Sequence, residues 1–188
     1  MSKFKTVQLE NMQFEHGLVY ENYGEANQRM IGPTRGGCTF EATQTIRDIE
    51  FDGKKGKSKG MQVIDAIDCK LTFGELSIAI EDLQMAMPYL EKTGTDPDFK
   101  LECTSASLGL IKNEAYAKNI TMFGKLANGK YKKISIMNAM NEAPFSLAAV
   151  PNGEGIVNME VYGHWETDDS ASITQLFIIE DVATITNV

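Results

Sequence analysis

The chain has 188 residues, of which 43% are hydrophobic and 23% are charged, and its formal net charge is −8 at pH 7. This length predicts one domain with a hydrophobic core of its own. Because an acidic surface repels phosphate, tight nucleic-acid binding is not expected for the chain as a whole. No window approaches the roughly 18 apolar residues of a membrane span, and no apolar run near Met1 resembles a signal peptide.

The net charge lies in the last third of the chain. Residues 134–188 contain eight Asp or Glu and no Lys or Arg, whereas the charges of residues 1–133 balance. Both an ordinary solvated acidic surface and a surface for a partner explain this pattern. The three cysteines, Cys38, Cys69 and Cys103, are widely spaced and odd in number, which indicates reduced thiols made in a cytosol. Cys69 and Cys103 fall on predicted strands and are expected in the core.

The first 37 residues are predicted to be an N-terminal arm that leads into a single domain over residues 38–188. A strand over Met12–Tyr20 and a polar loop over Glu21–Arg29 are expected within the arm. The glycines and proline of Gly32–Gly37 predict a turn before the first long strand.

Residues 40–76 predict a long β-hairpin, the most informative part of the sequence. Apolar and polar residues alternate over Phe40–Phe51 and again over Met61–Leu76, as in half-buried strands. The alternation changes phase in the first strand, which predicts a β-bulge near Arg47–Asp48. Asp65 is the exception on the apolar face of the second strand.

The length of this hairpin exceeds what one domain covers. A strand over Met61–Leu76 would span on the order of 50 Å at about 3.3 Å per residue. A compact chain of this length has a radius of gyration of about 16 Å, so it is roughly 40 Å across. A soluble protein must cover, pair or blunt such long strand edges. We therefore expect an assembly protein whose sheet is completed by neighbouring copies.

The loop over residues 52–60 joins the two strands and carries a local charge of +3 from four lysines and one aspartate. Its Gly56-Lys57-Ser58 sequence is not a phosphate-binding loop, because Phe51 stands where that motif needs glycine and the loop joins two strands. It is either a flexible hairpin loop or a cationic hook for an acidic patch on another subunit or ring. The lysines concerned are Lys54, Lys55, Lys57 and Lys59.

The remaining elements predict a mainly β protein with one flanking helix over about residues 77–89. Ser77 is the expected N-cap, and Ile80, Leu83, Met87 and Leu90 are expected on the buried face. Further strands are expected over 99–104, 116–127, 130–140, 155–166 and 173–180, while residues 105–114 remain ambiguous. Asn128-Gly129 predicts a type I′ hairpin turn.

No catalytic constellation is recognisable in the sequence. The two histidines, His16 and His164, have no partners at metal-ligand spacing, and there is no Cys-x-x-Cys motif. No nucleophile elbow, kinase motif or dinucleotide fingerprint is present. We therefore expect a protein without enzymatic activity, cofactor or metal.

The sequence resembles the major tail tube proteins of long-tailed (siphovirus-like) bacteriophages. The residues that carry the resemblance are 31–37, Phe40-Glu41, 46–53, Lys59-Gly60, 71–76, Gly124-Lys125-Leu126 with the Asn128-Gly129 turn, and 162–166. The resemblance covers most of residues 15–181 and rests on pattern more than on fixed residues.

This resemblance implies a β-sandwich or partly open barrel of the phage tail tube and type VI tube kind. It implies hexameric rings that stack into a tube in the virion tail, assembled in the host cytoplasm, through which genomic DNA is ejected. The implied partners are other copies of the chain, tape measure protein and DNA in the lumen, and the tail terminator and tail tip proteins. The arm and the hairpin loop would then reach neighbouring subunits and rings.

A tube that conducts DNA needs a wall that does not bind it, so acids and small polar groups should line the lumen. Such residues occur on the non-core faces of the predicted hairpin, which we expect to be lumen-facing. They are Glu41, Thr43, Thr45, Asp68 and Thr72. Arg47 and Lys70 interrupt this surface and are expected to pair with acids across the strands.

Three alternatives remain open from the sequence. A tail-terminator or head–tail connector protein would form one ring and stop. The inner tube of a contractile tail or of a secretion system would have a similar fold. An enzyme or ligand-binding barrel would need convergent polar groups.

Overall fold

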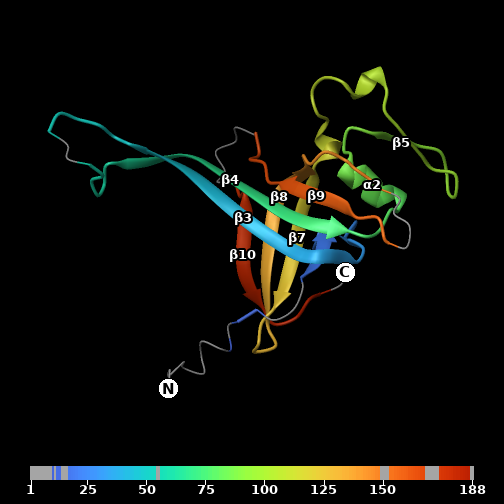
Figure 1. Cartoon of the computed structure of the whole chain (residues 1–188), viewed down its shortest axis with the longest axis horizontal. Coiled ribbons are helices and arrows are strands. Elements are labelled where there is room, and N and C mark those ends of the chain that lie inside the picture. Colours follow the sequence, from blue (N-terminus) through green and yellow to red (C-terminus); the bar gives the residue numbers. More distant parts are fainter. Residues whose placement is uncertain are drawn as a thin grey trace.

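Strand β8 (Tyr131–Asn141) joins the two β-layers of the protein in a computed structural model (Figure 1). The structure describes residues 10, 12–13, 17–53, 56–148, 153–167 and 174–186. One layer contains β1 (Leu18–Glu21), β2 (Arg29–Met30), β7 (Ala117–Lys125), β8 and β10 (Phe177–Val182). The other contains β3 (Thr34–Asp48), β4 (Gln62–Glu75) and β9 (Val157–Tyr162). This confirms the predicted mainly β sandwich.

The end of β8 connects the layers through backbone pairing. Met140 and Asn141 pair with β9, after the earlier residues of β8 have paired with β7 and β10. Asn138 lies just before this transition with a left-handed φ of 47°, and its side chain donates to the backbone oxygen of His164 at 3.2 Å. Asparagine tolerates this conformation better than most residues. The layers therefore form one continuous antiparallel sheet that folds over on itself.

The core lies between the two layers. Phe73, Leu71, Ile120 and Ile136 are each at most 2% exposed. At the open side of the sandwich, Phe40 of β3 packs edge-to-face on Phe177 of β10, with ring centroids 5.2 Å apart. Edge-to-face pairs contribute about 0.5–1.5 kcal/mol beyond the area that they bury.

The long hairpin is confirmed, with shifted ends. The first strand begins at Thr34 because Gly36 and Gly37, expected in a turn, take positive φ values within the strand and produce a register shift between Arg35 and Cys38. A second shift lies between Thr45 and Ile46, two residues before the expected position. There the extra residue is on β4, and it is Asp65.

The β7–β8 hairpin also occurs where it was expected, but its turn is of another type. Gly129 has φ of 81° and its N–H donates to the oxygen of Leu126 at 3.0 Å, whereas Asn128 does not have positive φ. This pattern indicates a type I turn followed by a glycine bulge. The Asn128 side chain accepts from the N–H of Lys130 at 2.9 Å, which explains the asparagine.

The flanking helix α2 (Ile80–Ala86) is shorter than the expected 77–89 and is rotated. Its buried residues are Asp82 and Ala86, whereas the apolar residues expected on the buried face are only partly buried. Ser77 is not the N-cap residue, which is Ala79, and the Ser77 hydroxyl instead donates to Asp82 at 2.5 Å. An ion pair of Asp82 with Arg29 on β2 turns this face of the helix toward the sheet.

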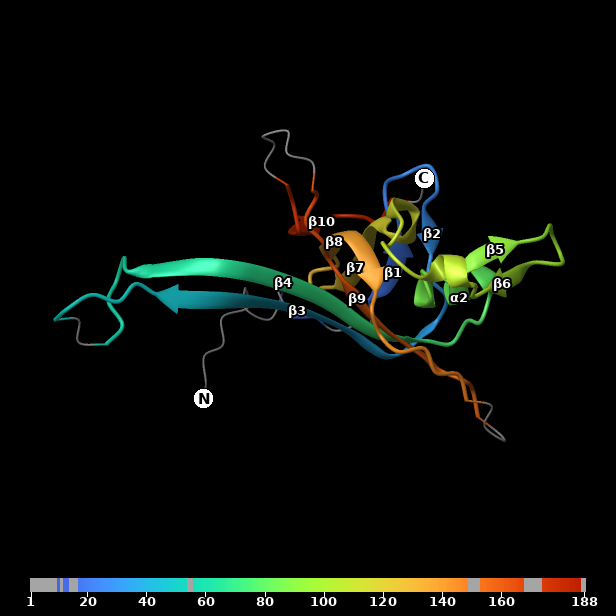
Figure 2. The ribbon, with the colours of Figure 1, turned by 90° about the horizontal axis from the view of Figure 1, so that it is seen from above.

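Residues 76–116 form a lobe at one end of the molecule, opposite to the tip of the long hairpin (Figure 2). Besides α2, the lobe contains β5 (Glu91–Thr93), β6 (Lys100–Glu102) and 3-10 turns at Ser105–Ser107 and Asn113–Ala115. The first of these turns lies in the segment that the sequence left ambiguous. Cys103 follows β6 and is exposed, so its expected place in the core was wrong, whereas Cys69 is buried.

The part of the predicted N-terminal arm that the structure describes is integrated into the domain. β1 pairs along β7, and Val19, Tyr20 and Ile31 are buried in or beside the core. The expected strand over 12–20 is thus represented by Leu18–Glu21, with an isolated bridge from Gln13 to Leu126. Residues 1–9 lie outside the described residues.

A buried acidic cluster fixes α2 on the sheet. Glu75 at the end of β4 is fully buried, and neither of its carboxylate oxygens makes a hydrogen bond of normal geometry within the described structure. Asp82 of α2 lies beside it, and Arg29 pairs with both Asp82 and Glu21. Burial, reinforced by the Asp82 charge, raises the pKa of Glu75 to about 7 against the opposing effect of Arg29.

Replacement of Glu75 by Gln should flatten the pH dependence of stability. The folded protein keeps a proton on Glu75 that the unfolded chain loses above about pH 4.5, so this group makes the free energy of unfolding fall from pH 4.5 to about 7. The loss is complete above pH 7 and amounts to about 3 kcal/mol. Urea unfolding at pH 5 and pH 8 should show Glu75→Gln more stable than the native chain at pH 8. The exposed Glu81→Gln is the control, and a native-like decrease in Glu75→Gln would contradict this assignment.

Candidate assembly interface

The distal half of the β3–β4 hairpin extends beyond the rest of the protein (Figures 1 and 2). β9 pairs with β4 only over Lys70–Glu75, so within the described structure the segments Thr43–Asp48 and Gln62–Asp68 have no strand partner except each other. The 14 residues of β4 would span about 46 Å when extended at about 3.3 Å per residue. A two-stranded ribbon of this kind is at best marginally stable in water without further packing.

Large apolar side chains cluster on this ribbon. Ile46 and Ile64 stand directly opposite each other and are 47% and 55% exposed, and Phe51 beyond them is 52% exposed. Ile49, Met61 and Val63 are also exposed. Burying such a side chain stabilises a contact by about 1.5–3 kcal/mol. An exposed apolar group of this extent indicates a surface for a partner.

The outer edge of β3 is the second feature that calls for a partner. β3 ends the strand order of the large sheet, and its only strand partner within the described residues is β4. The outward N–H and C=O groups of an edge strand can pair with another chain unless they are covered or blunted. Charged residues such as Glu41 and Arg47 lie along this strand and disfavour unspecific pairing.

The residues expected to line a lumen lie together on one face of the hairpin. The register places Thr43 opposite Asp68, Thr45 opposite Ala66, and Glu41 opposite Lys70. Thr72, opposite Thr39, continues the same face toward the body and is partly buried, whereas the other four residues are exposed. Directly opposed residues share a face in an antiparallel pair. Their orientation relative to other subunits is taken up below as a proposal.

The two cations on the predicted lumen face of the hairpin, Arg47 and Lys70, pair with acids. The Lys70 ammonium lies 3.3 Å from Glu41 and 3.6 Å from Glu160 on β9, and the Glu41 contact is the main cause of its raised pKa. The Arg47 guanidinium makes two contacts with Asp65, at 2.9 and 3.2 Å. Asp65, the exception in the apolar pattern, is therefore the bulge residue that pairs with Arg47. These pairs leave the predicted lumen face without an unpaired cation among its described residues.

The lysine-rich loop is only partly described. Lys57 and Lys59 are exposed at the tip of the hairpin, whereas Lys54 and Lys55 lie outside the described residues. Among the six described acids of the last third of the chain, by contrast, four are paired with bases from the first two thirds. The pairs are Glu154 with Arg35, Glu160 with Lys70, Glu180 with Lys133 and Asp181 with Lys132. Much of the uneven charge along the sequence is thus compensated in space.

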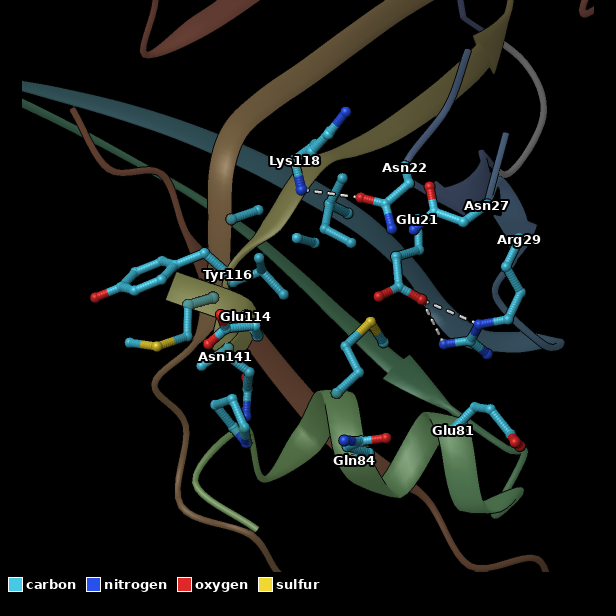
Figure 3. A pocket seen from close by; sticks show the side chains of 18 residues that line it. Glu21, Asn22, Asn27, Arg29, Glu81, Gln84, Glu114, Tyr116, Lys118 and Asn141 are labelled. Carbon is cyan, nitrogen blue, oxygen red and sulfur yellow. Dashed lines mark hydrogen bonds and ion pairs between the residues drawn. The ribbon is translucent and has the colours of Figure 1, made fainter. Parts of the chain in front are cut away.

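A pocket of about 330 Å³ lies between α2 and the sheet (Figure 3). Most of its charged side chains pair with one another or with neighbours: Arg29 with Glu21 at 2.8 Å, Glu81 with Lys92, and Lys118 with Glu25. We interpret it as the seam along which the helix is docked. Among the described residues there is no group of three or more His, Cys, Asp or Glu placed to hold a metal ion. In the same part of the chain, no helix is long and apolar enough to cross a membrane.

One exposed apolar surface escaped the sequence analysis. Leu108 and Leu110 in the lobe are 83% and 100% exposed, and Tyr89 and Ile111 are each 52% exposed. They lie in or beside the segment of residues 105–114, where no helical or strand period is visible. The run Leu108-Gly109-Leu110-Ile111 was the available signal, because three large apolar residues within four positions, outside any periodic element, are not expected to share one buried face.

The fold is similar to that of a known assembly component. A chain in the cryo-EM structure of the anti-feeding prophage (AFP) baseplate, 6-fold symmetrised, superposes with a TM-score of 0.50 at 10% sequence identity. The similarity covers 96% of this chain and 97% of that one. No protein-family model and no curated protein matches the sequence. The comparison thus shows a shared fold over nearly the whole length.

Substitution of Ile64 by Thr should weaken self-association without unfolding the protein. Thr keeps the β-branched shape, so at this exposed site the free energy of unfolding should change by less than about 1 kcal/mol. The matched control is Ile136→Thr, since Ile136 is fully buried and its loss should cost about 2 kcal/mol or more. Sedimentation velocity and urea unfolding separate the two effects. A loss of stability in Ile64→Thr with unchanged association would contradict the interface.

Proposed function

We propose that this chain is a structural subunit of a phage-type tail, which assembles into stacked hexameric rings and forms the tail tube. The observation that carries the proposal is the overhanging hairpin. Its exposed apolar residues and free outer edge need partners, and strands from successive subunits that close into a barrel would supply them. The similarity in fold to a chain of a prophage baseplate supports the same class of protein.

A ring of identical subunits requires a head-to-tail contact, and stacking of rings gives a filament. The proposal of six subunits is supported by the 6-fold symmetrisation of the assembly that contains the similar chain. In such a ring the hairpins of all subunits would form one continuous inner sheet. We propose that the lysine loop reaches neighbouring subunits or rings, whereas the described part of the expected arm over residues 1–37 packs within its own domain.

The lumen wall would consist of the hairpin face that carries Glu41, Thr43, Thr45, Asp68 and Thr72. The two cations on that face among the described residues, Arg47 and Lys70, are both paired with acids. Such a wall repels phosphate and does not retain DNA in transit. The tube would thereby act as a conduit for genome ejection into the host, with the tape measure protein inside before ejection and terminator and tip proteins at its ends. The chain would be located in the virion tail after assembly in the host cytoplasm.

A second candidate function is a ring that does not extend into a tube, such as a baseplate, connector or terminator component. The observation in its favour is that the similar chain comes from a baseplate structure. Both functions use the same lateral contacts. They differ in whether the two ends of the ring can stack on further copies.

Negative-stain electron microscopy of the purified protein, concentrated at moderate salt, tests the assembly. We expect hollow filaments of uniform width, with matching large species in sedimentation velocity. Single rings without filaments would favour the second candidate. A monomer at every concentration in both measurements would contradict self-assembly by this chain.

The lumen face is tested by the accessibility of a cysteine at position 43. In a Cys38→Ser, Cys103→Ser background, Thr43→Cys in intact filaments should react with a small maleimide but not with a bulky polymer-linked one. Equal reaction with both reagents would place the face outside the tube, and reaction with neither would place it in a subunit contact. Disassembled protein, in which both reagents should react, is the control.

A further inference from the structure

The hairpin tip and the lobe lie at opposite ends of the long axis of the molecule (Figures 1 and 2), and each carries exposed apolar residues. The hairpin patch surrounds the distal end of the ribbon: Ile46 and Ile64 lie on one face, Val63 lies on the other, and Ile49, Phe51 and Met61 lie beyond them toward the tip. The lobe patch comprises Tyr89, Leu108, Leu110 and Ile111. Because they are at opposite ends, they cannot cover each other within one molecule.

The lobe patch borders a groove of about 460 Å³. Tyr89, Leu110 and Ile111 line it together with Leu90, which is partly buried. Polar side chains such as Gln84, Thr93 and Glu114 line the rest of it. The groove is therefore a concavity of mixed polarity with apolar side chains along one part, a shape that can receive an extended segment of another chain.

The loop that carries the leucines is held by specific interactions. Thr104 caps the 3-10 turn: its hydroxyl accepts from the N–H of Ala106 at 3.2 Å, and its own N–H donates to the Ser107 hydroxyl at 3.3 Å. At the other end of the loop, Lys112 pairs with Glu91 of β5 at 2.8 Å. The leucines are thus held in solvent by a fixed backbone. Their contact with water is unfavourable, and a partner that covers them would remove this contact.

Charge favours the hairpin tip as the occupant of this groove. The lobe, residues 76–116, holds seven Asp or Glu and three Lys, a net charge of −4, whereas the loop at residues 52–60 carries +3. The three lobe lysines are already paired, with Glu81, Glu102 and Glu91. Opposite potentials steer two surfaces together and set their register.

We propose that the hairpin patch of one copy docks in the lobe groove of the next copy. This inference rests on the proposed function and names the contact that joins neighbouring subunits in it. The contact is head-to-tail, because each copy offers a hairpin at one end and a groove at the other. Such a contact repeats from copy to copy and gives a ring or a filament, not a closed dimer.

Cysteine cross-linking between two chains of different mass tests this contact. Both carry Cys38→Ser and Cys103→Ser, one adds Ile64→Cys, and the other adds Leu110→Cys. Both new positions are more than half exposed, so folding should be unaffected. After mild oxidation of the mixture, the disulfide between the two different chains should be about tenfold more abundant than either disulfide between identical chains. This is expected for a contact that brings the two thiols together. The control uses Ile179→Cys in place of Leu110→Cys. Ile179 is a half-exposed residue of β10 outside both patches, so this pair should not give an excess of the mixed disulfide.

The outcomes separate this inference from the function on which it rests. Rings or filaments in the microscope without the mixed disulfide would overturn the docking and leave the assembly standing. The mixed disulfide with only short open oligomers would support the docking and contradict the tube. Neither assembly nor mixed disulfide would overturn both. As a second readout, Leu110→Ser should weaken association about tenfold, as for an anchor in a groove, whereas Ile179→Ser should not.

Discussion

A β-ribbon longer than its own domain is the constraint on which the rest of this structure depends. The body covers β4 with β9 only up to Lys70, and beyond that point the two strands have no strand partner in the described chain except each other. Within the described residues, Ile46 and Ile64 therefore remain about half exposed. The described domain therefore leaves apolar side chains of its own sheet exposed to water. Burying them against another chain would stabilise association.

The body of the protein is built to hold this ribbon rigidly at its base. Its two layers are joined by backbone pairing at Met140 and Asn141, and the core packs directly under the root of the hairpin at Leu71 and Phe73. At the end of β4 the buried Glu75 contacts the charge cluster that docks α2. The lobe and the hairpin are thus anchored on the same strand, one at each end of β4.

The elements that the sequence predicted well are those defined by a local period. Alternation over 40–76 identified the long hairpin and a bulge, because side chains of a strand alternate between its faces. The alternation predicts the bulge near Arg47–Asp48, two residues after its observed position. The reason is that Asp65 is the inserted residue and not an exception in the apolar pattern. Gly36 and Gly37 were assigned to a turn because the same positive φ values serve turns and bulges.

The parts that escaped prediction depend on contacts between distant segments. The orientation of α2 follows from the ion pair of Asp82 with Arg29, 53 residues away, and not from the apolar spacing of the helix itself. The lobe patch has no period, because Leu108 and Leu110 pack on nothing within the described chain. The predicted lumen residues do share one face of the hairpin, which alternation alone was able to establish.

The bulge at Thr45 and Ile46 has a geometric consequence for any assembly of this chain. An inserted residue bends the strand and increases its local right-handed twist. Here the insertion lies between the base of the ribbon and its apolar tip, and the Arg47–Asp65 pair spans it. The bend fixes the angle at which each ribbon leaves its domain. When subunits repeat around an axis, this angle determines the curvature of the wall that their ribbons form. The bore of a closed ring would then depend on a single extra residue in β4, so that deleting it would change the diameter before it changed the fold.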